Sequence, residues 1–226
     1  MLIASDLVQV LQPLLDMDSP VFPQAALRQV CVHMLWGVVL AAAGWRVAYV
    51  LQPHWRLAWA ACVGIASSLP GPLSPAYWLE LAFASPSWTS VLLCGLWLWR
   101  QTRPQAVFSD PWTPRPIIHI PLPWVLCGIG LGWVLALDTF AALPMQQSIY
   151  GWGFSPLASV VLMVGAAAAW IISARWVHAL PFLAIALFVL TRLPSGNVWD
   201  AVSDPLLWLY LHLHLAAQGW RYLRGR

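Results

Sequence analysis

Three long, predominantly apolar segments restrict the fold of this chain more than any other feature. They cover about residues 27–51, 123–143 and 156–177, and each reaches the roughly 20 residues that a helix needs to cross a bilayer. Only 8% of the residues are charged, against about a quarter in soluble domains. Seventeen tryptophans agree with a membrane setting, because indole rings favour the lipid–water interface. We expect an all-α, tryptophan-rich integral membrane protein.

Four shorter apolar segments bring the expected number of transmembrane helices to about seven. They cover about residues 56–69, 87–100, 179–193 and 205–220. The last reads "DPLLWLYLHLHLAAQGW", and its alternation of leucine with polar residues resembles a strand. A lone strand in lipid leaves its backbone groups unsatisfied, so a helix beginning at Asp204-Pro205 is the better prediction. Whether residues 56–69 and 87–100 cross completely stays open.

The positions of the arginines predict the orientation. If all seven segments cross, most arginines fall on one side: Arg46, Arg56, Arg100, Arg103, Arg115, Arg175, Arg221, Arg224 and Arg226. The other side carries Asp6, Asp16, Asp18, Asp138, Asp200 and Asp204, with Arg28 and Arg192 as its basic residues. Short arginine-rich loops stay in the cytoplasm. The prediction is a multi-pass protein of a bacterial inner membrane, with its N-terminus outside and its C-terminus in the cytoplasm.

The chain is expected to form one transmembrane domain with two peripheral segments. Residues 1–22 place apolar side chains at helical spacing, which predicts an amphipathic helix at the membrane surface. Residues 23–226 form the helical bundle. A proline-rich stretch at about 101–122 cannot form a regular helix and is predicted to be a cytoplasmic loop.

Polar and aromatic residues gather on the predicted outer side. The candidates for a site are Asp138, Glu80, Arg192, Asn197, Trp199, Asp200 and Asp204. An unpaired charge at membrane depth is costly, so we expect an ion pair or network around Arg192. Such a network either holds the outer connections together or lines a pocket for a small ligand. Asp138 is the strongest single candidate, because it lies within a long apolar segment.

Two histidines, His212 and His214, lie near the middle of the last segment. Ionisable residues at this depth usually face the bundle interior, and either histidine is a candidate for binding haem b or quinone. Two helical residues two positions apart cannot both face one metal, so a bis-histidine haem needs a partner at equal depth. No other histidine matches that depth well. Neutral histidines that hydrogen-bond between helices are the alternative.

Small residues at 128–132 ("GIGLG") and 165–169 predict close helix packing rather than nucleotide binding, because both stretches lie inside apolar segments. The usual motifs of hydrolases, metalloproteases and nucleotide-binding enzymes are missing from the sequence. The chain also has no lysine, which excludes a Schiff-base lysine. A net charge of +3 gives no indication of nucleic-acid binding.

The leading hypothesis is a non-enzymatic subunit or assembly partner of a larger membrane complex. One alternative is a small transporter that uses Asp138, Glu80 and Arg192 in a periplasm-facing polar site. The other is a redox protein that holds haem b or quinone through His212 or His214.

Overall fold

The computed structural model describes residues 25–102, 120–143, 148–173 and 178–224. Every regular element in these ranges is helical, which confirms the all-α prediction. The longer elements are α2 (Ala25–Val47), α3 (Pro53–Ser68), α5 (Trp88–Thr102), α6 (Leu122–Thr139), α8 (Pro156–Ser173), α9 (Ala179–Thr191) and α11 (Pro205–Arg224). The shorter ones are the 3-10 helix η1 (Ala48–Val50) and the helices α4 (Pro75–Phe83), α7 (Ile149–Trp152) and α10 (Val198–Val202). The predicted surface helix at 1–22 and most of the predicted loop at 101–122 lie outside the described residues.

Each of the seven predicted segments coincides with a helix, but fewer helices than expected suit a membrane span by length and composition. Three are long and apolar enough: α2 with η1 (Ala25–Val50), α6 and α8. The helices α3, α5 and α9 have 16, 15 and 13 residues, or about 20 to 24 Å at 1.5 Å per residue. Helix α11 is long enough with 20 residues, but its histidines and glutamine lower its hydropathy. The chain is therefore a helical membrane protein with three clear candidate spans.

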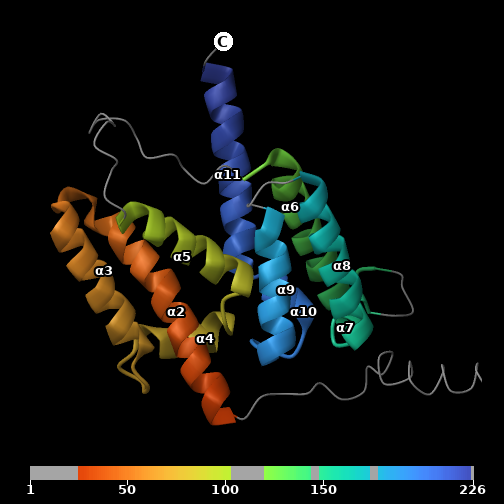
Figure 1. Cartoon of the computed structure of the whole chain (residues 1–226), viewed down its shortest axis with the longest axis horizontal. Coiled ribbons are helices and arrows are strands. Elements are labelled where there is room, and N and C mark those ends of the chain that lie inside the picture. The colour runs from red at the N-terminus through yellow and green to blue at the C-terminus, as the bar shows by residue number, and fades with distance from the viewer. Residues whose placement is uncertain (1–24, 103–119, 144–147, 174–177, 225–226) are drawn as a thin grey trace, which may run out of the picture.

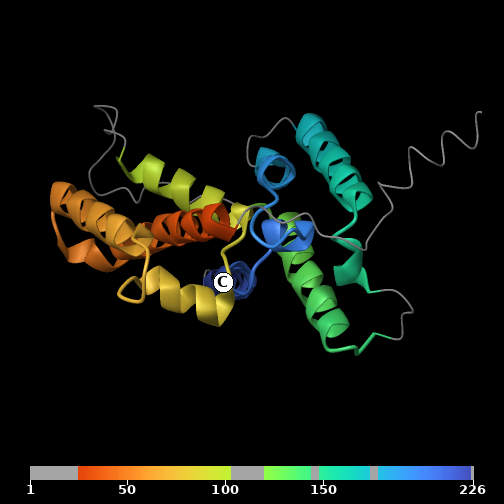
Figure 2. The same ribbon diagram turned by 90° about the horizontal axis from the view of Figure 1, so that it is seen from below.

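The helices form two groups with α11 between them (Figures 1 and 2). In the first group, α2 packs against α3, α4 and α5; in the second, α8 packs against α9, and α9 contacts α10. Contacts between α5 and α9 join the groups, and α11 packs along α6. The three short helices α4, α7 and α10 all lie at one end of the molecule, opposite the end of α11 that projects from the bundle (Figure 1). We call this the short-helix end.

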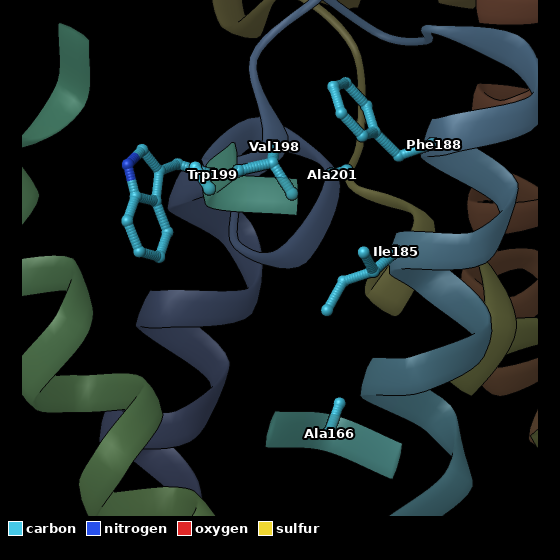
Figure 3. Packing of buried hydrophobic residues seen from close by; sticks show 7 residues of the cluster. Ala166, Ile185, Phe188, Val198, Trp199 and Ala201 are labelled. Atoms are coloured by element: carbon cyan, nitrogen blue, oxygen red, sulfur yellow. The ribbon is translucent and has the colours of Figure 1, made fainter. Parts of the chain in front are cut away.

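A buried cluster anchors the short-helix end to the second group (Figure 3). It joins α8, α9 and α10 through Ala158, Ala166, Ile185, Phe188, Val198, Trp199 and Ala201. Phe188, Val198 and Ala201 are completely buried. Because α10 has only five residues, this packing, and not intrinsic helix stability, holds it in place. It thereby positions Asp200, which lies within α10, and Asp204, which follows it.

Glycines allow α11 to approach α6 closely. A side chain at Gly132 would overlap the Trp208 indole, and one at Gly128 would lie 2.5 Å from the Leu211 side chain. The Trp208 indole N–H also donates a hydrogen bond to the Ile129 carbonyl at 3.2 Å. This confirms the predicted packing role at Gly128 and Gly132, whereas nothing lies within 4 Å of a side chain added at Gly130. In the stretch 165–169, Ala166 packs in the buried cluster with α9, whereas nothing lies within 4 Å of a side chain added at Gly165.

Candidate functional site

Asp204 joins the starts of two helices that are far apart in the sequence. Its Oδ1 accepts a hydrogen bond from the Leu207 backbone N–H at 2.7 Å, which caps α11. Its Oδ2 accepts hydrogen bonds from the Ser87 backbone N–H at 2.8 Å and the Ser87 hydroxyl at 2.7 Å, which caps α5. The Ser90 hydroxyl donates a further bond to Oδ2 at 2.5 Å. A carboxylate near two helix N-termini is favoured by the helix dipoles as well as by these bonds.

Asn197 and Trp199 attach α10 to α7. The Asn197 amide donates to the Tyr150 carbonyl, and the Trp199 indole N–H donates to the Ile149 carbonyl, both at 2.9 Å. The Asn197 Oδ1 also accepts from the Trp199 backbone N–H, so Asn197 caps α10. Both residues were predicted as site candidates. Here their polar atoms satisfy the backbone of two short helices.

Asp200 lies between Tyr150 and the loop that follows α9. Its Oδ2 accepts hydrogen bonds from the Tyr150 hydroxyl, at 2.8 Å, and from the Ser195 hydroxyl. Burial raises the pKa of Asp200 above its usual range, and the two hydroxyl donors oppose this shift. Burial, together with the neighbouring Asp200 charge, also raises the pKa of Tyr150. The tyrosine therefore acts as a hydrogen-bond donor to a fixed carboxyl group.

Asp138, the strongest candidate in the sequence, caps the short helix α7. Its Oδ2 accepts from the Ser148 hydroxyl at 2.7 Å and from the Tyr150 backbone N–H at 2.8 Å. Ser148 in turn accepts from the Gly151 backbone N–H. This capping role explains why an acidic residue stands at the end of an apolar helix. The role of Asp138 as a transport gate stays a prediction.

Glu80 and Arg192 do not take part in the hydrogen bonds described above. The Glu80 Oε2 is 3.7 Å from Nδ1 of the buried His33 on α2. Arg192 ends α9 in the left-handed conformation, with its guanidinium 5.7 Å from the Phe188 ring centre. The expected ion pair between Arg192 and Asp138, Glu80, Asp200 or Asp204 does not form. The three aspartates instead accept their hydrogen bonds from hydroxyl and backbone donors in neighbouring helices and loops.

The two candidate cofactor histidines lie on different faces of α11, as expected. His212 bonds the Trp208 carbonyl through Nδ1 at 2.8 Å, and its ring packs against Trp208 and Trp133. His214 shares a hydrogen bond of 2.8 Å with Gln218. Within the described ranges, no group of three or more His, Cys, Asp or Glu side chains is placed to hold a metal ion. Haem or quinone binding stays a prediction for both.

A cavity of about 600 Å³ opens at the short-helix end, between the two helix groups. Glu80 and Arg28 line it from the first group, and Tyr150, Asp200 and Asp204 line it from the second group and the start of α11. The structure thus brings three of the predicted acidic residues to one cavity. Arg28 and Tyr150 were not among the predicted site residues.

The serines that donate hydrogen bonds to Asp204 and Asp138 were also not predicted. Ser87 and Ser148 each precede an apolar helix, which is a typical N-cap signal, but nothing in the sequence pairs them with a particular aspartate. No family model, curated protein or solved structure matches this chain.

Proposed function

We propose that the chain is a multi-pass protein of a bacterial inner membrane that acts as a non-enzymatic subunit or assembly partner of a larger membrane complex. In this proposal the short-helix end faces the outside and the C-terminal end of α11 lies in the cytoplasm. The distribution of arginines supports this orientation, since Arg46, Arg100, Arg221 and Arg224 lie near helix ends remote from the short helices.

The directions of the helices support seven crossings. Helices α2, α5, α8 and α11 run away from the short-helix end, and α3, α6 and α9 return to it (Figure 1). The shorter helices fall below the roughly 30 Å of a bilayer core. Local thinning of the bilayer accommodates such a mismatch at a modest energetic cost.

The observation that carries the subunit proposal is a row of polar side chains on α11. Tyr210, His214 and Gln218 follow each other at intervals of four residues, which places them on one side of the helix. The Tyr210 and His214 rings are 5.8 Å apart, and a hydrogen bond of 2.8 Å joins His214 to Gln218. We call these three residues the α11 polar row.

The surroundings of α11 leave this row beside an open surface. Leu207 and Leu211 are buried in the cluster that contains Val125 of α6, whereas Tyr210 is 45% exposed. The C-terminal end of α11 projects from the bundle (Figure 1). Polar side chains at membrane depth favour contact with another helix over contact with lipid. The row therefore suits a transmembrane helix of a different protein that carries hydrogen-bonding side chains.

Neighbouring alanines on α11 provide a matched test. Ala217 lies about 60° around the helix from His214, and Ala216 lies about 160° from it, given 3.6 residues per turn; both are exposed. A photo-crosslinking amino acid at each position in living cells reports what contacts each face. We expect Ala217 to yield one stoichiometric crosslink to another membrane protein and Ala216 to yield little.

Removal of the polar row provides the control. Combined His214→Leu and Gln218→Leu substitutions should lower the crosslink yield at position 217 by about tenfold, the loss of roughly 1.4 kcal/mol of binding energy. The variant must still elute as a single species in detergent. Equal yields at both positions, or products with lipid alone, would overturn the proposal. A crosslink between two copies of this chain would replace it with a homo-oligomer.

A further inference from the structure

The connection between α2 and α3 carries arginine and aromatic side chains on a short stretch of chain. It runs from the last turn of α2 through η1 to the first turn of α3, and it lies at the end of the first helix group that is remote from the short helices (Figure 1). We call residues 45–56 the α2–α3 corner. Its side chains include Trp45, Arg46, Tyr49, Trp55 and Arg56.

Contacts with the end of α2 hold Arg56 in place. Its guanidinium lies 5.1 Å from the centre of the Trp45 ring, and Nη2 donates a hydrogen bond to the Trp45 carbonyl at 3.3 Å. A guanidinium that stacks on an indole and bonds a carbonyl at a helix C-terminus loses much of its freedom before any ligand arrives. Such preorganisation reduces the entropic cost of binding.

Trp45 supplies a hydrogen-bond donor that the described part of the chain does not satisfy. The residue is only 3% exposed, and its indole N–H has no acceptor among the described residues. A buried donor without an acceptor is costly. Because the Arg56 guanidinium lies over the same ring, a group with several acceptor oxygens can bond the indole N–H and the guanidinium together. A phosphate is such a group.

The charges near the corner favour an anion. Arg46 is exposed and Arg56 is half-buried. The last turn of α5, which carries Arg100, reaches the same end of the first helix group (Figures 1 and 2). The acidic residues of the described ranges all belong to the short-helix end; they are Glu80, Asp138, Asp200 and Asp204. The field around the corner is therefore positive.

The exposed apolar and aromatic side chains of the corner favour a lipid over a soluble anion. Val47, Tyr49, Val50 and Trp55 are all exposed, beside two arginines. Tyrosine and tryptophan gather at the level of the lipid headgroups, and arginine extends its charge to the same level. The phosphates that surround a protein at this depth belong to phospholipids, and their acyl chains cover the apolar side chains.

We propose that the α2–α3 corner binds the phosphate of an anionic phospholipid, with Arg46 and Arg56 as the cationic groups and the Trp45 indole as a hydrogen-bond donor. The proposal rests on the proposed position of this end at the cytoplasmic membrane surface, but not on the α11 polar row. Lipid binding in nanodiscs can be measured whatever the orientation in the cell and without a partner protein. The lipid site and the subunit proposal can therefore fail separately.

The experiment compares an anionic with a zwitterionic phospholipid. The intact protein is placed in nanodiscs that hold equal amounts of phosphatidylglycerol and phosphatidylcholine with the same acyl chains, and native mass spectrometry counts the lipids that it retains. We expect preferential retention of phosphatidylglycerol. An arginine near the membrane surface strengthens anionic-lipid binding about fivefold, so Arg46→Gln should weaken retention about fivefold and the double variant with Arg56→Gln about 25-fold.

Arg28→Gln is the matched control, because Arg28 is an exposed arginine at the opposite end of the same helix. It removes the same charge and should leave phosphatidylglycerol retention unchanged. Arg46→Gln preserves the contact between Arg56 and Trp45, so it tests the site even where the double variant does not fold. Trp45→Phe keeps an aromatic ring but removes the donor, and it should weaken retention about three- to fivefold without lowering the apparent Tm.

Three results would refute the proposal. The first is equal retention of phosphatidylglycerol and phosphatidylcholine by the unsubstituted protein. The second is an equal loss of phosphatidylglycerol in Arg28→Gln and Arg46→Gln, which indicates attraction to the overall charge and not to the corner. The third is displacement of the lipid by millimolar inorganic phosphate, which identifies a site for a free anion.

Discussion

Replacement of Asp204 tests whether one carboxylate holds the starts of α5 and α11 together. The side chain is 8% exposed, and it accepts bonds from the backbone N–H groups of Ser87 and Leu207 as well as from two serine hydroxyls. In Asp204→Ala the hydroxyls can rotate to other acceptors, but the two backbone donors lose their partner. Each unsatisfied buried donor costs about 1 to 3 kcal/mol. The expected loss of stability is therefore about 2 to 6 kcal/mol.

The same geometry predicts a graded series. Asp204→Asn keeps one acceptor oxygen, which can cap either α5 or α11 but not both, so about half of the loss is expected. Asp138→Ala is the matched control, because Asp138 is partly exposed and caps only the four-residue helix α7. Water replaces an exposed partner at little cost, so this variant should lose less than about 1 kcal/mol.

The assay is the fraction of fluorescently tagged protein that stays monodisperse in detergent after heating, measured by size-exclusion chromatography at one heating rate. For a protein of this size, 1 kcal/mol corresponds to about 2 to 4 °C in Tm. Asp204→Ala should lower the apparent Tm by about 4 to 24 °C. An apparent Tm for Asp204→Ala equal to that of Asp138→Ala would refute the reasoning, as would an Asp204→Asn variant no more stable than Asp204→Ala.

Three further predictions follow from the packing and the charges. Gly132→Ala should lower stability by about 1 to 3 kcal/mol, because the new methyl group overlaps the Trp208 indole; Gly130→Ala, where nothing lies within 4 Å, should leave the apparent Tm unchanged or slightly raised. Trp199→Phe should cost about 1 to 3 kcal/mol, since it removes the indole donor to the partly buried Ile149 carbonyl. Burial raises the pKa of Asp200 from its ordinary 3.8, so the folded protein holds this proton more tightly than the unfolded chain. The resulting stability is full below that value and is lost as the pH rises through the raised pKa. The apparent Tm of the unsubstituted protein should thus fall relative to that of Asp200→Asn as the pH rises from about 3 to 8, and a constant difference would contradict the assignment.

The positions of the long helices could be predicted from the sequence because apolar length and helix-start signals are local. Pro156 and Pro205, each preceded by a serine or an aspartate, mark the first residues of α8 and α11. The same signal occurs at Ser74 and Pro75, where α4 begins and Ser74 caps it. That helix was nevertheless not predicted, because a nine-residue helix resembles a turn when its neighbours are unknown.

The partners of the predicted polar residues could not be derived, because they depend on contacts between distant parts of the chain. Asp204 and Ser87 are 117 positions apart, and no local pattern links them. The ion pair expected for Arg192 assumed that a carboxylate near the membrane needs a cation. Hydroxyl and backbone N–H donors meet the same requirement for Asp138, Asp200 and Asp204, since charge-assisted hydrogen bonds are individually strong.

The acidic residues at the short-helix end thus have two different physical roles. Both oxygens of Asp204 and the Oδ2 of Asp138 serve helix starts, so these two residues bear on stability. Asp200 instead joins the side chains of Tyr150 and Ser195 through its Oδ2, so it links α10 to α7 and to the loop after α9. Asp204 nevertheless lines the cavity and starts α11, the helix that carries the polar row. Its loss should therefore weaken both the stability of the protein and its partner contact, whereas the combined His214→Leu and Gln218→Leu substitutions should weaken only the partner contact.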